Sequence, residues 1–423
     1  MRNTYPLPFR VSFWSLILTL FLAFVGPEMY AQSAQRMRAV QLIQEGDNNL
    51  QMGLFNDAIF SYTNAITTDP TYAEAYMKRA SILQRVGRYT EAKRDMEKAK
   101  QMNPYSAYVM DGSAKLNFIS ADYAEGLEEI QQAINMDPEN MNFIDHRVDG
   151  YILAGEYEKA KKDIENLLFH SHHLGLTYLK QGLIEFLDGN YEAADDALVQ
   201  SRELSPNNAL AHDIRGLIRL QQNDYDTALY HFDKALEINP DFSLALYNKG
   251  VTYKMLNEDE KALGYFDEAI QKQLAISESF FSRGVVKTEL GRHEGAIQDY
   301  SKVKERDSIY FDAIYNRAFS YKMLGNFPSA LADANKAVEM RPRDADALAM
   351  RGNIHLLFGD YKKAIEDYDE ALQWDGSMVE VRFNKGLALL FDHRLKEACA
   401  ELKRAVDDGY EKGGAAFRNF CAP

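Results

Sequence analysis

The sequence predicts an all-α solenoid of about eleven helix-turn-helix repeats, each 34 residues long. Three observations lead to this fold class. The same pattern of small and apolar residues returns every 34 residues from 39 to 412, without insertion or deletion. Position 20 of the period holds Ala or Gly in every repeat. Helix-stopping Gly and Pro recur at positions 15 and 32. Such a fixed period indicates stacked repeats instead of separate globular domains.

The first repeats show how each element is predicted. Residues 73–86 read as one helix, Gly87 to Tyr89 as a turn, and the residues that follow, through Gln101, as a second helix that stops before Pro104. Gly at position 15 supplies the left-handed residue that ends a helix, and Asn223 and Asn257 take its place in two repeats. Pro at position 32 stops the second helix. The repeats begin at 39, 73, 107, 141, 175, 209, 243, 277, 311, 345 and 379.

Small residues at positions 8 and 20 predict close contact between the two helices of each repeat. Position 20 carries ten alanines and Gly126, and position 8 carries Gly or Ala in every repeat except the one with Val148. We expect irregular junctions where the pattern fails. In the repeat at 141, the exceptions are Val148, Leu167 and His172. In the repeats at 243 and 277, Leu274 and Ser308 replace the expected Pro.

This pattern resembles the tetratricopeptide repeat (TPR), and the resemblance covers residues 39–412. It implies a right-handed superhelix of antiparallel helix pairs with a concave inner face. Repeat arrays need capped ends. Residues 413–423 are therefore predicted to form a C-terminal capping helix that presents Phe417 and Phe420.

The N-terminal residues predict export. Arg2 and Arg10 precede an apolar run from Val11 to Val25, which is too short to span a bilayer comfortably, and small residues follow at Ala31 and Ser33. We interpret 1–33 as a signal peptide with linker, and 34–38 as a short further linker. Cleavage after either small residue fits, and an uncleaved anchor is the alternative. The absence of Asn-x-Ser/Thr motifs favours the periplasm or exterior of a bacterium over a eukaryotic secretory route.

Charge and cysteine content limit the function classes. The net charge of −15 disfavours nucleic acid as a partner. No cofactor, small-molecule substrate or membrane span after cleavage is indicated. Cys399 and Cys421 are interpreted as two buried thiols, with a disulfide as the alternative that export would permit.

No catalytic motif is recognisable, so the sequence predicts a protein that is not an enzyme. His170, His172 and His173 lie together, with His146 upstream, and Zn or Cu binding is one interpretation of this cluster. We favour a His-rich surface loop, because no cysteine or spaced carboxylate completes a ligand set. The predicted metal site is therefore none.

The resemblance implies that positions 2, 5, 9, 12 and 13 of the first helix face the concave groove. Large apolar side chains occupy many of these positions, and such surfaces usually bind partners. Core packing is the alternative interpretation. The predicted groove residues are Leu176, Leu179, Leu183, Phe186, Leu187, Leu217, Leu220, Tyr247, Phe281, Tyr315 and Phe383.

Two recognition modes of the family are disfavoured. No repeat has Lys at position 5, where cochaperone repeats hold a C-terminal carboxylate. Asn at position 6, which holds peptide backbone in sugar-transferase repeats, occurs only at Asn248, Asn316 and Asn384. The prediction is a non-catalytic scaffold or adaptor in the cell envelope that binds protein partners. A chaperone-like binder of exported clients is the alternative.

Overall fold

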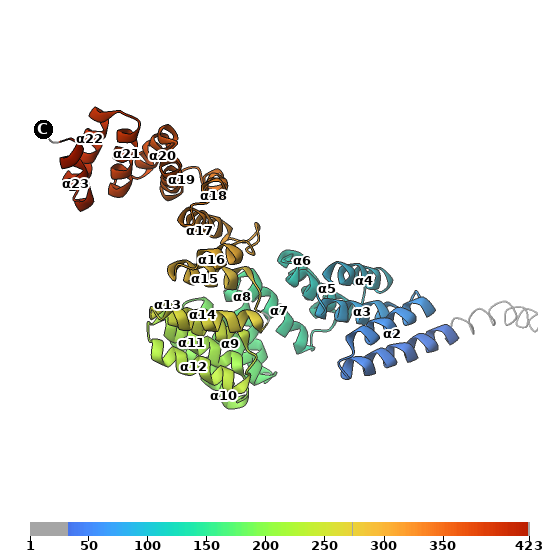
Figure 1. Cartoon of the computed structure of the whole chain (residues 1–423). Helices are drawn as coiled ribbons and strands as arrows, with labels where there is room; N and C mark the ends of the chain where they lie inside the picture. Colours follow the sequence, from blue (N-terminus) through green and yellow to red (C-terminus); the bar gives the residue numbers. More distant parts are fainter. Residues whose placement is uncertain (1–32, 273, 422–423) are drawn as a thin grey trace, which may run out of the picture. The chain divides into compact units, whose positions relative to one another are not determined.

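The computed structural model describes residues 33–272 and 274–421, and these residues fold into helices and turns without a strand (Figure 1). The predicted signal peptide falls on residues outside this range. The chain divides into two compact units, with unit 1 ending at Pro206 and unit 2 beginning at Asn207. Each unit is described by itself. Among the described residues, every helix is too short or too polar to cross a bilayer.

Unit 1 begins with a helical stretch from 33 to 51. Its remaining helices are α2 (Phe55–Thr68), α3 (Ala73–Arg85), α4 (Tyr89–Met102), α5 (Ala107–Ile119), α6 (Tyr123–Met136), α7 (Met141–Ala154), α8 (Tyr157–Phe169), α9 (Leu174–Leu187) and α10 (Tyr191–Leu204).

Unit 2 continues the alternation of first and second helices. Its helices are α11 (Ala209–Gln221), α12 (Tyr225–Ile238), α13 (Ser243–Met255), α14 (Asp259–Gln271), α15 (Ser277–Glu289), α16 (His293–Tyr300), α17 (Tyr310–Met323), α18 (Phe327–Met340), α19 (Ala345–Phe358), α20 (Tyr361–Trp374), α21 (Val379–Phe391), α22 (Leu395–Asp407) and α23 (Glu411–Phe420). Within each unit, helices adjacent in sequence pack on one another (Figure 1).

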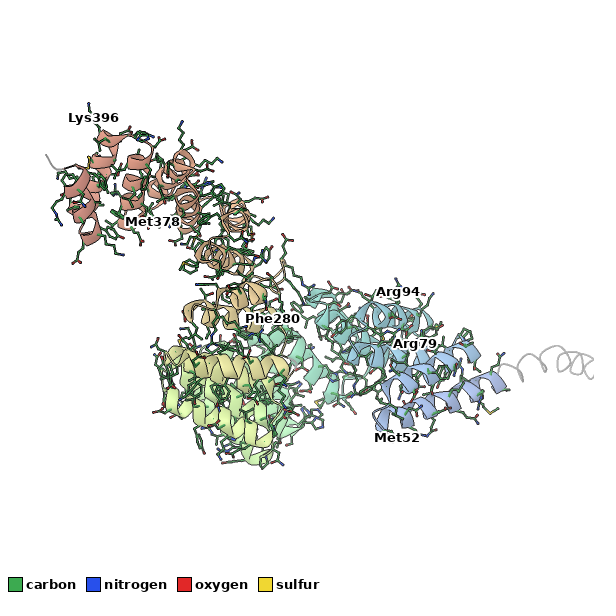
Figure 2. All side chains as sticks on the ribbon, in the orientation of Figure 1. Met52, Arg79, Arg94, Phe280, Met378 and Lys396 are labelled. Atoms are coloured by element: carbon green, nitrogen blue, oxygen red, sulfur yellow. A yellow bond between two sulfur atoms is a disulfide. The ribbon has the colours of Figure 1, made fainter. Side chains whose placement is uncertain are left out.

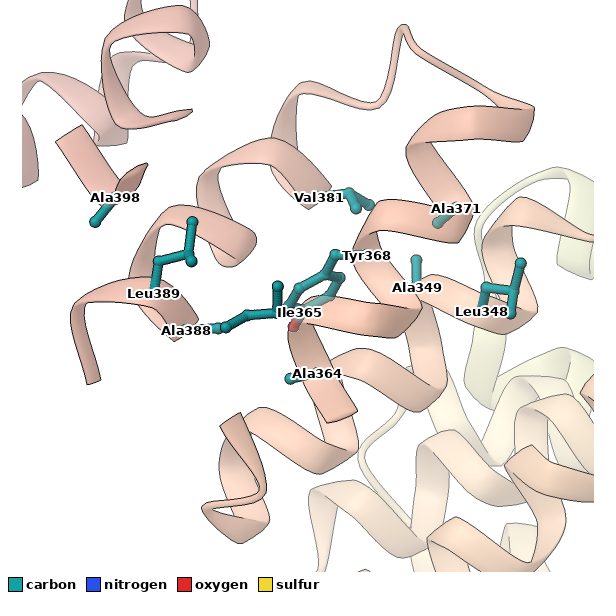
Figure 3. Packing of buried hydrophobic residues seen from close by; sticks show 10 residues of the cluster. All are labelled: Leu348, Ala349, Ala364, Ile365, Tyr368, Ala371, Val381, Ala388, Leu389 and Ala398. Atoms are coloured by element: carbon teal, nitrogen blue, oxygen red, sulfur yellow. The ribbon is translucent and has the colours of Figure 1, made fainter. Parts of the chain in front are cut away.

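The core of a repeat is a large side chain at position 24 packed against a small one at position 8. Phe232 is fully buried, and a Cβ added to Gly216 would lie 2.4 Å from its ring. Tyr368 packs in the same way against Gly352, and it is surrounded by Ala349, Ile365 and Val381 (Figure 3). Gly at position 8 therefore lets the second helix bring a ring against the backbone of the first.

Where position 8 is larger than glycine, the side chain at position 24 is not an aromatic ring. Ala114 faces Ile130, and Val148, the exception in the sequence pattern, shares its buried cluster with Ile164. Aromatic rings at position 24 thus occur only where position 8 is glycine, since a Cβ at position 8 would overlap the ring. Val148 is fully buried, so the repeat at 141 keeps a packed centre despite its departure.

Position 15 is left-handed in all eleven repeats. The seven glycines there have φ between 71° and 93°, and Asn223 and Asn257 have φ of 59° and 57°, which confirms their predicted role. Ala121 and His393 take the same conformation at φ of 62° and 61°. A side chain with a Cβ is strained there, so these two turns form because the packed helices on either side impose them.

A recurrent arginine at position 7 joins several of the repeats to the repeat before them. Arg79 makes two 2.7 Å hydrogen bonds to Asp95 in its own repeat, and its Nη1 donates to Thr63 of the preceding repeat at 3.1 Å (Figure 2). The spacing of 16 residues recurs at Arg147, Arg283, Arg317 and Arg351. Such bidentate pairs fix orientation as well as adding energy.

Two of the junctions expected to be irregular are so. Between α8 and α9, Ser171 and His173 both have positive φ, at 51° and 40°. Helix α16 has only eight residues and gives way to turns before α17, in the repeat where Ser308 replaces the expected Pro. Without Pro, the chain leaves the second helix by a different backbone path.

The C-terminal cysteines form a disulfide, so the interpretation as two separate buried thiols is wrong. Cys399 of α22 is bonded to Cys421, which directly follows α23. Gly413 is the one buried residue of α23, and Phe420 is exposed. This helix buries little of its own surface, so the covalent link contributes to holding it on α22.

Replacement of both cysteines should release α23. The disulfide closes a loop with a separation of 22 residues, and such loops contribute about 3 kcal/mol. In Cys399→Ser/Cys421→Ser, we expect amide hydrogen exchange of α23 to accelerate by about a hundredfold, while α19 stays protected as the internal control. Unchanged protection of α23 would show that its packing suffices.

Gly216→Ala should destabilise the repeat that contains it. The new Cβ meets the Phe232 ring, and overpacking of this kind costs about 1–3 kcal/mol. Gly264 in α14 has open space around its Cβ, so Gly264→Ala should instead stabilise by up to about 1 kcal/mol through helix propensity. Thermal unfolding midpoints measure both. Equal shifts in the two variants would contradict the size-matching argument.

Candidate interaction surface

Most of the position-5 aromatic side chains pack inside their repeats. The ring of Tyr247 lies 5.4 Å from that of Phe266, and Phe281 lies 6.0 Å from Tyr300, measured between centroids. Positions 5 and 8 are three residues apart on the same helix face. The large side chain that covers position 8 therefore also reaches position 5, which agrees with the alternative interpretation of these residues as part of the core.

The remaining position-5 aromatics are also half-buried. Tyr315 packs against the cluster around Ala318, and the Phe383 ring lies 5.0 Å from that of Tyr410. Part of each ring remains exposed. They contribute to the surface, but much of their area is already used in holding the repeats together.

The predicted leucine row of α9 and α11 divides between core and surface. Leu179 is 6% exposed and belongs to the core, whereas Leu176 and Leu187 are 41% and 43% exposed. The other four predicted residues are half-buried, namely Leu183, Phe186, Leu217 and Leu220. Only the ends of the predicted row are thus open to a partner.

Sequence reasoning missed the exposed apolar row at position 13, of which it named only Leu187. This position ends the first helix, and we call its apolar members the position-13 row. In unit 1 the row contains Ile119, Leu153 and Leu187, which are 43–51% exposed. In unit 2 it contains Met255, Met323, Leu357 and Phe391, which are 55–58% exposed. The signal was available, since seven of eleven repeats carry a large apolar residue there.

Buried polar pairs join the first helices of successive repeats. Asp145 accepts a hydrogen bond from Lys180 Nζ at 2.8 Å, and Asp213 accepts one from Asn248 at 2.9 Å. Asp111 contacts His146 at 2.6 Å in the same manner, with a spacing of 35 residues. Burial of charge is costly unless it is paired, so these side chains are committed to the stack.

The asparagines at position 6 are engaged in the same way. Asn248 donates to Asp213, Asn384 donates to Asn353 at 3.0 Å, and Asn316 donates to the carbonyl oxygen of Asp312 at 2.9 Å. Their amide groups thus donate hydrogen bonds within the chain.

The histidines of the α8–α9 junction do not come together with His146, which is held by Asp111. His170 Nδ1 contacts the carbonyl oxygen of Asn166, and the rings of His172 and His173 lie 4.0 Å apart. Burial lowers the pKa of His172. Over the described part of the chain, no group of three or more His, Cys, Asp or Glu is placed to hold a metal ion.

One hollow in unit 1 lies where the first helices begin. Its volume is about 530 Å³, and its lining includes Tyr72, Met77, Met102 and Tyr108. At the edge of the hollow, the guanidinium of Arg36 lies 4.3 Å from the centre of the Tyr72 ring. Met77 and Tyr108 occupy positions 5 and 2, so the hollow belongs to the face that the resemblance assigns to partners.

Three segments of the chain match known repeat families. Residues 73–106 and 315–378 match the family described as "Tetratricopeptide repeat", and residues 216–257 match that described as "TPR repeat". The chain therefore contains tetratricopeptide repeats. These segments lie in both units, and their helix pairs have the same bounds and packing as those of the intervening repeats.

Curated relatives match TPR segments of this protein. Tetratricopeptide repeat protein 13 of Homo sapiens is 39% identical over 19% of this chain. Hsp70-Hsp90 organizing protein 3 of Arabidopsis thaliana is 24% identical over 24% of it, and DnaJ protein P58IPK homolog B of Oryza sativa is 26% identical over 29%. The matches span 9%, 18% and 28% of these relatives, respectively.

Solved structures of TPR proteins are also similar. A tetratricopeptide repeat protein from Parabacteroides merdae aligns with a TM-score of 0.40 and 21% identity, over 58% of this chain and 96% of that one. Yeast Tom70 aligns with a TM-score of 0.38 and 15% identity, over 89% of this chain and 93% of that one.

Asp213 should make the stability of unit 2 depend on pH. Burial raises the pKa of its carboxyl group to about 6, against an ordinary value of 3.8. The folded state holds this proton more tightly than the unfolded chain does. The contribution of this bound proton to the free energy of unfolding is therefore complete below pH about 4, and it is lost as the pH rises through about 6.

Asp213→Asn should remove this dependence while keeping the acceptor for Asn248. We expect the variant to unfold at higher temperature than the wild type at pH 7, and the difference to vanish near pH 4. Thermal unfolding across this range checks it. Parallel profiles for the two proteins would show that the carboxylate is not penalised by burial.

Proposed function

We propose that this TPR protein is a non-catalytic adaptor that binds partner polypeptides along its first helices, on the face assigned to the concave groove. The observation that carries the proposal is the position-13 row. Its side chains are about half exposed although they are large and apolar. Soluble proteins seldom leave such rows uncovered unless they bind something.

The rigid setting of the row suits recognition. Leu153 and Leu187 end helices whose interiors are fixed by buried pairs such as Asp145 with Lys180. A surface held in place before binding loses little entropy when a partner docks. Several weak apolar contacts at equivalent positions of successive repeats can then add to a specific interaction.

The non-catalytic part of the proposal rests on the use of the buried ionisable groups. Asp111, Asp145 and Asp299 are each paired with a cation or imidazole across helices. Groups committed to such structural pairs are poorly placed for proton transfer to a substrate. The resemblance to TPR proteins points the same way.

We place the adaptor outside the cytoplasm, in the envelope of a bacterium. The charged, apolar and small segments within 1–33 support export. The disulfide between Cys399 and Cys421 also supports it, because disulfides persist in oxidising compartments.

A chaperone-like binder of exported clients is the second candidate. The names of two relatives, an Hsp70-Hsp90 organizing protein and a DnaJ protein, favour it. The hollow beside Met77 and Met102 also suits it, since methionine side chains adapt to varied apolar partners.

Affinity capture from envelope extract of the source organism tests both candidates. Leu153→Asp/Leu187→Asp places charges on the position-13 row without touching a buried ring, and it is preferable to a change at Phe281, which packs on Tyr300. The matched control is Gln221→Asp, at the same helix position in a repeat without the apolar residue. Circular dichroism confirms that each variant is folded.

We expect one dominant, stoichiometric partner that the wild type and Gln221→Asp capture and the double variant loses by at least tenfold. A scatter of many clients, each lost in the double variant, would favour the chaperone-like function. The same proteins captured equally by all three chains would refute the row as the binding surface.

A further inference from the structure

In unit 2, the last three turns that join a first helix to its second helix carry a continuous apolar surface, which includes Met323, Leu357 and Phe391 of the position-13 row. We call it the turn strip. It consists of side chains at the end of a first helix and the start of the following second helix. They are Met323, Leu324, Phe327, Leu357, Phe358, Tyr361, Phe391 and Leu395.

Ring contacts join the three turns. The Phe327 ring lies 6.1 Å from that of Phe358, and the Tyr361 ring is stacked on that of Phe391 at 5.3 Å. Each contact runs from the second helix of one repeat to the first helix of the next. The strip is therefore one surface and not three isolated patches.

The strip is open on its outer side. Leu357, Phe391 and Leu395 are 58%, 55% and 54% exposed, and Phe358 is 51% exposed. Beneath it, Leu356 and Leu390 pack on the buried cluster around Tyr368. Figure 3 shows the residues of that cluster. A firmly packed base with large exposed side chains is the usual anatomy of a binding site for another polypeptide.

The sign of the net charge at these turns differs from that of the six turns directly before them. Over positions 13–19, the six repeats from 107 to 310 together carry ten more carboxylates than cations. The last three repeats carry one more cation than carboxylates over the same positions. In a chain of net charge −15, the apolar strip thus coincides with a local loss of negative charge.

Two lysines beside the strip are available to a partner. Lys363 is paired with Asp360, and Arg394 is paired with Glu397. Lys362 and Lys396 are exposed and form no ion pair with any residue within the described ranges (Figure 2 labels Lys396). They follow Tyr361 and Leu395 directly, so each lies at the margin of the apolar side chains.

We propose that the turn strip binds an acidic amphipathic segment of a partner protein, whose apolar side chains cover Leu357, Phe391 and Leu395 and whose carboxylates meet Lys362 and Lys396. The proposal rests on the adaptor function and adds the chemistry of the bound segment. It also locates a binding surface at the helix turns, apart from the row of unit 1. Charge complementarity selects this occupant over a basic or neutral one.

The geometry of the repeats suggests a helical segment. Packed helices lie about 8–10 Å apart, and residues seven apart on an α-helix are separated by about 10.5 Å. Apolar residues at heptad spacing can therefore meet successive turns of the strip. About 20 residues, or 30 Å of helix, suffice to cover three turns.

The test uses fluorescence anisotropy with the full chain and a labelled helical peptide of about 20 residues. The peptide carries Leu at heptad spacing and Glu on the flanks, and it is used below its self-association concentration. A second peptide has the same Leu residues with Lys in place of Glu. We expect the acidic peptide to bind at least tenfold more tightly than the basic one, with affinity falling as salt is added.

Variants of the strip assign the contact. Leu357→Ser/Leu395→Ser should weaken binding of the acidic peptide at least tenfold, and Lys362→Glu/Lys396→Glu at least fivefold at low salt. The matched control, Lys162→Glu/Lys412→Glu, makes the same charge change at two other exposed lysines and should leave binding unchanged. Thermal unfolding checks that all variants fold.

Several results would overturn the proposal. These are no binding, equal binding of the two peptides, or binding that the strip variants do not alter. If light scattering showed that the wild type self-associates and the strip variants do not, a second copy would be the occupant. If phosphatidylglycerol vesicles bound the chain through the strip while the peptide did not, the surface would face a membrane. Capture lost in Leu153→Asp/Leu187→Asp would still support the adaptor in each of these cases.

Discussion

The close approach of two helices is the constraint on which the rest of this protein depends. Where position 8 is glycine, the ring or leucine at position 24 presses directly on the backbone of the first helix, as Phe232 does on Gly216. This contact sets the distance between the helices. The distance in turn determines which neighbouring positions are covered and which remain open to solvent.

Size matching, and not smallness alone, is what the packing requires. Ala114 with Ile130 and Val148 with Ile164 form buried cores in which an aliphatic side chain takes the place of the ring. The pattern of small residues at position 8 therefore described only one of the two side chains that pack together. The other side chain, at position 24, lies 16 residues later, which is also the spacing of the Arg79–Asp95 pair.

The regular elements could be predicted from sequence because each depends on residues within one repeat. Gly at position 15 and Pro at position 32 mark helix ends by local backbone preference, and the structure follows them. The surface was harder to predict, because exposure depends on side chains from other helices. Phe281 looked open on its own helix, but Tyr300 covers part of it. The disulfide was also undecided, since pairing requires Cys399 and Cys421 to meet in space.

The residue at position 13 is not constrained by the packing between the two helices of a repeat. It lies at the end of the first helix, beyond the reach of the side chain at position 24. Its residues, and those of the adjacent turn, can change without altering the packed centre of a repeat. Leu357 and Phe391 thus stand on the same core architecture as the exposed polar residues Gln221 and Glu289 at equivalent positions. In a stack of nearly identical helix pairs, differences in partner preference must come from such unconstrained positions. The change of net charge between the middle and last turns is a difference of this kind. It lies at positions where a substitution has little effect on the packing of a repeat.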